Sequence, residues 1–245
     1  MKDVLLKVIS NKEIAKNTYE ARLSGDISDI SAPGQFVNIK LDGFYLRRPI
    51  SVCDAEGGVL TIIYKAVGAG TEAMARTEAG AEWLTLTGLG NGYDTSLSGE
   101  RPLLIGGGAG VPPMYMLAKR LISEGKKPTV ILGFNTKSEV FYKEEFTKIG
   151  ARVIVATADG SEGVKGFVTD AMAHIDYTYF YTCGPEPMLK AVYKSSATDG
   201  QFSFEERMGC GFGACMGCSC KTVVGYKRIC KDGPVLKKEE ILWEK

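Results

Sequence analysis

Cysteine is the residue type whose spacing implies the most chemistry in this chain. Five of its seven cysteines lie between residues 208 and 230. Cysteines separated by four and then by two residues, with one more downstream, follow the plant-type pattern of thiolates that hold a [2Fe–2S] cluster. Glycines interleave with them, which lets the loop turn its thiols toward one point and brings backbone amides near the sulfurs. We predict that the cluster ligands are Cys210, Cys215, Cys218 and Cys230.

Two alternatives to this ligand set stay open. If residues 218–220 are extended, Cys218 and Cys220 share a face, so that Cys220 could replace a ligand. A tetrahedral zinc ion also takes four cysteines, and the chain would then be a zinc-binding scaffold rather than an enzyme. Zinc sites more often use paired C-x2-C units, and only Cys215 and Cys218 form one, so the spacing favours the cluster.

Two upstream segments have residue types that suit a phosphate-bearing, flat cofactor. Residues 48–51 combine an arginine fork with a hydroxyl around a proline that fixes the backbone, which suits a pyrophosphate. A strand start with solvated arginines is the plainer interpretation. In the second segment, Tyr64 could cover a flat ring system, and Gly70 and Thr71 would open a helix whose N-terminus attracts anions. A glycine-rich turn between a strand and a helix would look the same.

A glycine run at 106–110 indicates a dinucleotide site. It lies between a short apolar stretch at 101–105 and a predicted helix that starts with prolines at 112 and 113. Dinucleotide-binding domains place their phosphate loop at such a junction, although Val111 stands where the G-x-G-x-x-G pattern has its last glycine. Residues 183–185 likewise stand at the carboxyl end of a predicted strand, which is the sheet edge where ligands bind.

The elements that must position these residues fall into three predicted domains. Residues 1–98 have six strand patterns, at 4–9, 18–23, 35–41, 49–53, 59–67 and 82–87, which predict an antiparallel β-barrel with one short helix at 71–79. Strands and helices alternate over residues 99–205, which predicts an α/β domain with a parallel sheet. Residues 206–245 would form a small cluster domain, with a terminal strand or tail at 237–243.

Composition excludes several classes of protein. The chain has 245 residues with a net charge of +1 and no long basic stripe, which argues against a nucleic-acid partner. No apolar stretch is long enough to span a membrane, and the first residues do not read as a secretion signal. Bunched cysteines are typical of metal binding in a reducing compartment, so we expect a cytoplasmic protein.

Taken in order, these motifs resemble the electron-transfer subunit of class B (NAD-dependent) dihydroorotate dehydrogenase, in the ferredoxin–NADP⁺ reductase superfamily. The resemblance covers essentially the whole chain and implies an FAD-binding barrel, an NAD-binding domain and a C-terminal [2Fe–2S] domain. It implies FAD contacts at Arg48, Pro49, Ile50, Ser51, Ile63, Tyr64, Lys65, Gly70 and Thr71. It implies NAD(H) contacts at Gly106, Gly107, Gly108, Ala109, Gly110, Cys183, Gly184 and Pro185.

Departures from the wider superfamily bear on both the flavin and the cluster. The superfamily favours an aromatic residue where Ile50 stands, so stacking on the flavin must come from elsewhere, with Tyr64 as the candidate. Eleven residues separate Cys218 from Cys230, a much shorter gap than plant ferredoxins have before their fourth cysteine.

The resemblance also implies partners. The subunit would pass electrons between NAD(H), FAD, the cluster and an FMN-containing catalytic subunit, which interconverts dihydroorotate and orotate in pyrimidine biosynthesis, within a heterotetramer of two subunits of each kind. Because the cofactors carry the chemistry, we expect no catalytic acid, base or nucleophile in this chain. A related NAD(P)H-dependent reductase that serves a ferredoxin- or sulfide-linked enzyme is the alternative. No arginine occurs at 135–138, where a 2′-phosphate would be held, which favours NADH, although Lys137 leaves NADPH open.

Overall fold

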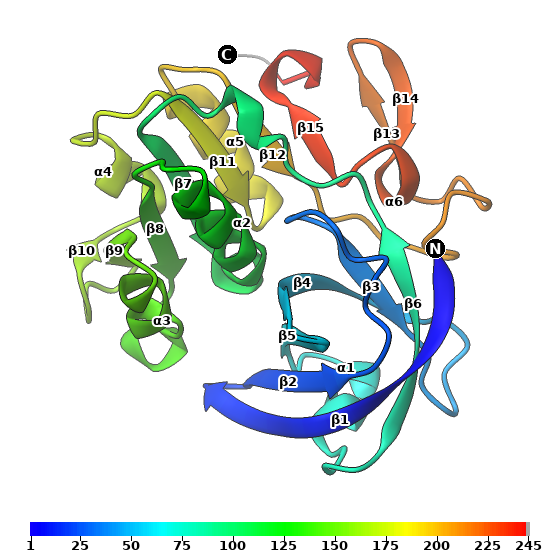
Figure 1. Ribbon diagram of the computed structural model, residues 1–245. Coiled ribbons are helices and arrows are strands. Elements are labelled where there is room, and N and C mark those ends of the chain that lie inside the picture. Colours follow the sequence, from blue (N-terminus) through cyan, green and yellow to red (C-terminus); the bar gives the residue numbers. More distant parts are fainter. Residues whose placement is uncertain (244–245) are drawn as a thin grey trace.

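The computed structural model describes residues 1–243; residues 244 and 245, the last two of the predicted cluster domain, lie outside it. Figure 1 shows a β-barrel in blue and cyan, a sheet flanked by helices in green and yellow, and a small hairpin region in orange. Within residues 1–243, no helix is both long and apolar enough to cross a membrane.

The barrel is closed and antiparallel, as the strand patterns predict. Hydrogen-bonded strands follow one another around the barrel in the order β1-β2-β5-β4-β3-β6. The strands are β1 (Lys2–Ala15), β2 (Thr18–Ser24), β3 (Phe36–Ile39), β4 (Arg48–Glu56), β5 (Val59–Lys65) and β6 (Glu82–Leu89). Helix α1 (Ala69–Ala75) follows β5 and starts earlier than expected, because the Thr71 hydroxyl accepts a hydrogen bond from the N-cap amide of Gly68 and so belongs to the first turn.

Strand β3 faces two different parts of the molecule. Val37 and Ile39 point into the barrel core, whereas Phe36 and Asn38 lie on the outer face, since successive strand residues alternate. Phe36 packs in a buried cluster with Cys218 and Cys230 from the far end of the chain. The barrel wall is therefore in direct contact with the cysteine-rich segment.

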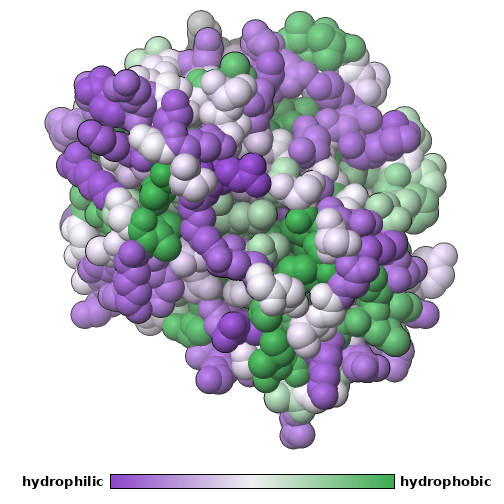
Figure 2. Space-filling model, in the orientation of Figure 1, coloured by the Kyte–Doolittle hydropathy of each residue, from purple (hydrophilic) through white to green (hydrophobic). Residues whose placement is uncertain are grey.

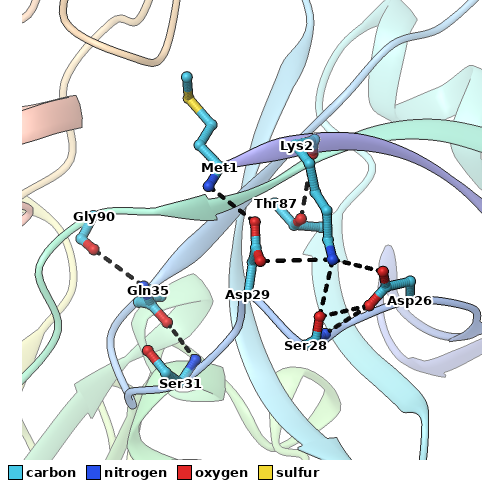
Figure 3. Close-up of polar contacts among 9 residues, drawn as sticks. All are labelled: Met1, Lys2, Asp26, Ser28, Asp29, Ser31, Gln35, Thr87 and Gly90. Carbon is cyan, nitrogen blue, oxygen red and sulfur yellow. Dashed lines mark hydrogen bonds and ion pairs between the residues drawn. The ribbon is translucent and has the colours of Figure 1, made fainter.

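One end of the barrel is tied by polar contacts that Figure 3 shows. The ammonium of Lys2 lies 2.5 Å from a carboxylate oxygen of Asp26. The Gln35 side chain accepts from the backbone N–H of Ser31 at 2.8 Å and donates to the carbonyl of Gly90 at 3.2 Å. These contacts fix the connection that leads into β3 against β1 and the end of β6.

The second part is a seven-stranded sheet in the order β10-β9-β8-β7-β11-β12-β15. Its strands are β7 (Pro102–Gly107), β8 (Thr129–Phe134), β9 (Arg152–Thr157), β10 (Val164–Lys165), β11 (Tyr179–Cys183), β12 (Gly200–Ser203) and β15 (Val235–Lys237). All neighbours are parallel, as expected, except that β15 runs antiparallel to β12. β15 comes from the predicted cluster domain and covers backbone groups that the edge of β12 would otherwise expose.

Helices cover both faces of this sheet. They are α2 (Pro112–Ser123), α3 (Lys143–Lys148), α4 (Val168–Met172) and α5 (Glu186–Ser195). Leu104 packs with α2 and α3, whereas Leu103 and Ile105 pack with α4 and α5 on the opposite face. The apolar run of β7 is buried on both sides, which is why it reads as continuous rather than alternating.

The third part is built from a short hairpin and one helical turn. β13 (Ser219–Thr222) pairs with β14 (Gly225–Arg228), and α6 (Ile229–Asp232) follows directly. Ile229 and Cys230 of α6 are buried against Leu86 and Leu89 of the barrel. The hairpin and α6 thus bring Cys230 back beside the loop that contains the other cysteines.

Candidate functional site

The predicted cluster cysteines lie together as two pairs. The backbone N–H groups of Ala214 and Cys215 donate to Cys210 Sγ at 3.2 and 3.4 Å. The backbone N–H of Cys230 donates to Cys218 Sγ at 3.4 Å. Burial raises the pKa of the Cys210 thiol, but these amide hydrogen bonds outweigh it and bring the pKa to about 6. The loop therefore stabilises a thiolate, which is the form that binds metal.

The local backbone fits an iron–sulfur cluster in its donor chemistry. Four thiols with amide donors aimed at sulfur are the ligands and the surrounding hydrogen bonds that such clusters use. A Cβ added at Gly209 would come within 3.2 Å of Cys215 Sγ, so glycine leaves the sulfur its space. Among residues 1–243, no three His, Cys, Asp or Glu side chains form a metal-binding group, and the four thiols lie as two pairs.

Cys220 packs against the buried cluster that contains Cys218 and Cys230. It lies on β13, half-buried, and lines a pocket of about 140 Å³ together with Leu189 and Trp243. Burial raises the pKa of its thiol, which favours the protonated form. Burial raises the pKa of the proposed ligand Cys230 as well, to about 12, so the pKa does not separate the two cysteines, and it is the cysteine spacing that favours the ligand set without Cys220.

The two arginines of the first upstream motif have different electrostatic surroundings. Arg47 pairs with both carboxylate oxygens of Asp3, at 2.6 and 3.1 Å. No carboxylate in the described part of the chain pairs with Arg48, whose guanidinium stacks on Phe44 at 4.8 Å. A Cβ at Gly70 would lie 2.0 Å from Arg48 Nε, so Arg48 crosses the first turn of α1. The Arg48 guanidinium donates to the Leu46 carbonyl but has no carboxylate partner among residues 1–243, so its charge beside the first turn of α1 suits an anion.

The remaining predicted FAD residues lie on β4, β5 and the start of α1. Pro49, Ile50 and Ser51 are half-buried on β4. Lys65, at the end of β5, lies 3.5 Å from Glu139 of the sheet domain. The Thr71 hydroxyl accepts from backbone N–H groups and donates to the Gly68 carbonyl, so it caps the helix rather than pointing outward.

The position of Tyr64 does not match its expected role as a cover for a flat ring. Its side chain is only 3% exposed, and its ring stacks on Tyr19 with centroids 5.8 Å apart. Its hydroxyl donates to Asn11 at 2.8 Å, and burial raises the pKa to about 12. The ring packs within the barrel, so any contact of this residue with FAD would come from its backbone.

The two predicted NAD(H) segments meet at one edge of the sheet. Gly106 of β7 pairs with Cys183 of β11 in parallel register. A Cβ at Gly110 would lie 2.1 Å from the Cys183 carbonyl, so only glycine permits this contact. Gly108 has a φ of +52° and nothing within 4 Å of its would-be Cβ, which leaves open space above the loop. Cys183 itself is 1% exposed, and burial raises the pKa of its thiol.

Glu139 is a residue that sequence reasoning missed. It follows β8 and accepts from the Asn135 side chain at 3.1 Å, in addition to its contact with Lys65. It thus connects the loop after β8 to the strand of the barrel that carries predicted FAD residues. No sequence pattern distinguishes it, because its partners are separated in the chain and meet only in the fold.

Comparisons with known proteins identify the same modules. The model for the iron–sulfur cluster binding domain of dihydroorotate dehydrogenase B matches residues 205–242, and the oxidoreductase NAD-binding domain matches residues 104–194. A Geobacillus sp. (strain WCH70) protein named dihydroorotate dehydrogenase B (NAD(+)), electron transfer subunit, is 44% identical, with 99% of each chain covered. A protein of the same name from Fusobacterium nucleatum is 47% identical, covering 93% of this chain and 94% of the relative.

Solved structures show the same arrangement. A structure described as NADH-dependent reduced ferredoxin–NADP oxidoreductase aligns with a TM-score of 0.88 and 30% identity, over 98% of this chain and 90% of that one. A ferredoxin NADP⁺ reductase from Neisseria gonorrhoeae aligns with a TM-score of 0.68 over 80% of this chain and 90% of its own, at 17% identity, which shows a shared fold.

Proposed function

This chain belongs to the family of dihydroorotate dehydrogenase B electron transfer subunits, and from this premise we propose which residues hold its cofactors and how electrons leave it. It is an oxidoreductase subunit with FAD, NAD(H) and a [2Fe–2S] cluster as cofactors. The zinc scaffold is therefore set aside. The observation that carries the proposal is the contact of the barrel wall with Cys218 and Cys230.

The proposed FAD site runs along the outside of β4 to α1. Arg48 and the first turn of α1 bind the pyrophosphate, because this guanidinium is not neutralised by a carboxylate of the described residues. The half-buried Pro49–Ser51 backbone and the backbone of Ile63–Lys65 flank the rest of the cofactor.

The proposed NAD(H) site lies at the edge of the sheet, and the proposed cluster site lies against the outer wall of the barrel. Gly106–Gly110 and Cys183–Pro185 bind NAD(H), with the open space at Gly108 next to the phosphates. Cys210, Cys215, Cys218 and Cys230 hold the cluster. The predicted domain limits, 1–98, 99–205 and 206–245, belong to this proposal, with β15 packed on the sheet of the second domain.

When bound, the three cofactors supply hydride transfer at one end and one-electron transfer at the other. The protein sets the positions of the three cofactors relative to one another. Ile63 of β5 packs with Val111 at the start of α2, which places the barrel next to the NAD(H) edge of the sheet. Phe36 and Leu89 pack in one buried cluster with Cys218 and Cys230, so an apolar contact joins the barrel to this part of the cluster domain. The fold therefore supports one route, from NAD(H) through FAD to the cluster.

We propose that an FMN-containing catalytic subunit receives the electrons, in a complex of two subunits of each kind, and that it docks over the cluster loop. The family name implies a catalytic partner. Phe212 and Met216 of this loop are 44% and 53% exposed, and Cys215 is exposed as well. Figure 2 shows a further apolar patch at the upper right, over the β13–β14 hairpin, where Val223 and Val224 lie.

Replacing Phe212 by aspartate is expected to weaken binding of the catalytic subunit by about 10-fold or more, since a buried unpaired charge costs over roughly 1.4 kcal/mol. The measurement is light-scattering mass and affinity of the mixed subunits. Phe167→Asp is the control, because Phe167 is 71% exposed and precedes α4, away from the hairpin in Figure 1.

The same mixture of subunits tests which subunit reacts with NADH and which reacts with dihydroorotate. The chain alone should oxidise NADH with an artificial acceptor and should leave dihydroorotate unchanged until the catalytic subunit is added. Oxidation of dihydroorotate by this chain alone would contradict the proposal. Equal affinity of the catalytic subunit for the Phe212→Asp variant and for the unaltered chain would place the partner elsewhere.

We propose the cytosol as the location of this protein, because none of its seven cysteines forms a disulfide and the cytosol keeps thiols reduced.

Asn135→Arg is expected to improve use of NADPH relative to NADH by roughly 10-fold, because a guanidinium at the end of β8 can bind a 2′-phosphate for about 1.4 kcal/mol. The ratio of kcat/KM for the two nucleotides measures this. Asn135→Gln keeps an uncharged amide and serves as the control. If the ratio of the arginine variant stays at that of the glutamine variant, the adenosine ribose lies away from this loop.

A further inference from the structure

Asn38 lies on the outer face of β3, where the barrel meets the cluster loop. Its side chain is 1% exposed, and its Nδ2 donates to the carbonyl oxygen of Cys210 at 3.3 Å. This hydrogen bond joins two residues that are 172 positions apart in the chain. It is a direct polar link from the barrel to a proposed cluster ligand.

The other half of the Asn38 amide is unusual. Asn38 Oδ1 and Thr182 Oγ1 are the buried side-chain polar atoms of residues 1–243 that have no hydrogen-bond partner. Leaving an amide oxygen buried and unpaired is unfavourable, because its hydrogen bond to water is lost on folding and is not replaced. Turning the amide over would not help, because it would place the oxygen against the Cys210 carbonyl. A residue kept only for packing would be apolar here.

Asn91 shows what a structural amide looks like in the same protein. Its Nδ2 donates to the Val235 carbonyl at 2.8 Å, and its Oδ1 accepts from the Val235 N–H at 3.1 Å. Both polar atoms of Asn91 are therefore satisfied, and the clamp holds β15 against the end of the barrel. The Asn38 side chain makes one hydrogen bond, through Nδ2, and its Oδ1 has no donor where the barrel meets the cluster loop.

The loop is shaped around Asn38. Gly211 has a φ of +79°, and a Cβ there would lie 2.3 Å from Asn38 Nδ2. On its other side, Asn38 pairs with Pro49 in the β3–β4 register, and its backbone carbonyl accepts from Arg47 Nη1 at 3.4 Å. One residue thus contacts both the strand of the proposed FAD site and the loop of the proposed cluster.

We propose that Asn38 is a positioning residue for the cluster, which holds the Cys210 segment against β3 and directs the positive end of its amide dipole toward the cluster loop. The inference rests on the proposed ligand set and assigns a role to a residue outside it. Because a donor dipole favours the more negatively charged, reduced cluster, Asn38 raises the cluster's midpoint potential.

The test is a redox titration of the purified chain followed by electron paramagnetic resonance, with FAD and iron contents measured on the same samples. Asn38→Leu and Asn38→Asp both remove the donor, and both are expected to shift the midpoint potential of the cluster to more negative values. The aspartate variant keeps the shape of the side chain, and its shift is expected to have the same sign as that of the leucine variant. If the leucine variant does not fold, the aspartate variant carries the test.

Asn91→Leu is the matched control, and it is expected to lower the unfolding temperature without moving the cluster potential. Potentials equal to that of the unaltered chain in the Asn38 variants would overturn the inference, because a merely structural amide affects only stability. An unaltered chain that contains no iron would instead refute the proposed ligand set, so the two failures are distinguishable.

Discussion

Cys215→Ser is expected to abolish cluster binding, with iron and sulfide falling to background in the purified chain. Cys215 is exposed, and its Sγ accepts from the backbone N–H of Cys210 at 3.5 Å, in the first thiol pair. A serine hydroxyl stays protonated at neutral pH and does not replace a thiolate ligand. Because the cluster is the proposed exit, electron delivery to the catalytic subunit should be lost.

Two further observations make this result specific. FAD content should be retained, since the proposed FAD residues lie on β4, β5 and α1. Cys220→Ser is the control and should keep its iron, because the cysteine spacing of the proposed ligand set is complete without Cys220. Loss of iron in the Cys220 variant and retention in the Cys215 variant would mean that the ligand set includes Cys220.

Arg48→Ala is expected to weaken FAD binding by roughly 10- to 100-fold, since a hydrogen bond to a charged group contributes about 1.5–3 kcal/mol. Arg48 is the arginine of its motif that no carboxylate of residues 1–243 neutralises, and it crosses the first turn of α1. The measurement is the FAD dissociation constant from flavin fluorescence of the reconstituted chain.

Arg47→Ala is the neighbouring control. Its guanidinium is paired with Asp3, so its removal leaves the proposed pyrophosphate site intact and should change FAD affinity little. Equal losses in both variants would indicate a general effect of positive charge. No loss in the Arg48 variant would move the pyrophosphate site away from α1.

Short-range patterns predicted most of the elements. Helix α2 begins at Pro112, where the two prolines predict a helix start, because proline is favoured in the first helical turn. The pairing of Gly106 with Cys183 follows from parallel topology, since adjacent parallel strands end at the same edge. The cysteine spacing likewise placed four thiols in one small region, in which each is near another.

Features that depend on contacts between distant segments were not predictable. Tyr64 looks like a free aromatic in sequence, but Tyr19 and Asn11 from neighbouring strands cover its ring and hydroxyl. β15 joins the sheet because it covers the edge of β12, which no local pattern encodes. Asn38 reads as an ordinary polar strand residue, and only the return of the chain at Cys210 gives it a partner.

We propose that electrons from NADH pass through FAD to a cluster held by Cys210, Cys215, Cys218 and Cys230. The most direct measurement is an anaerobic titration of the purified chain with NADH, in which flavin absorbance and electron paramagnetic resonance are recorded together. We predict that flavin bleaching is accompanied by the signal of a reduced [2Fe–2S] cluster, and that this signal is absent in Cys215→Ser. Bleaching of the flavin without a cluster signal in the unaltered chain would contradict the route from FAD to these thiols.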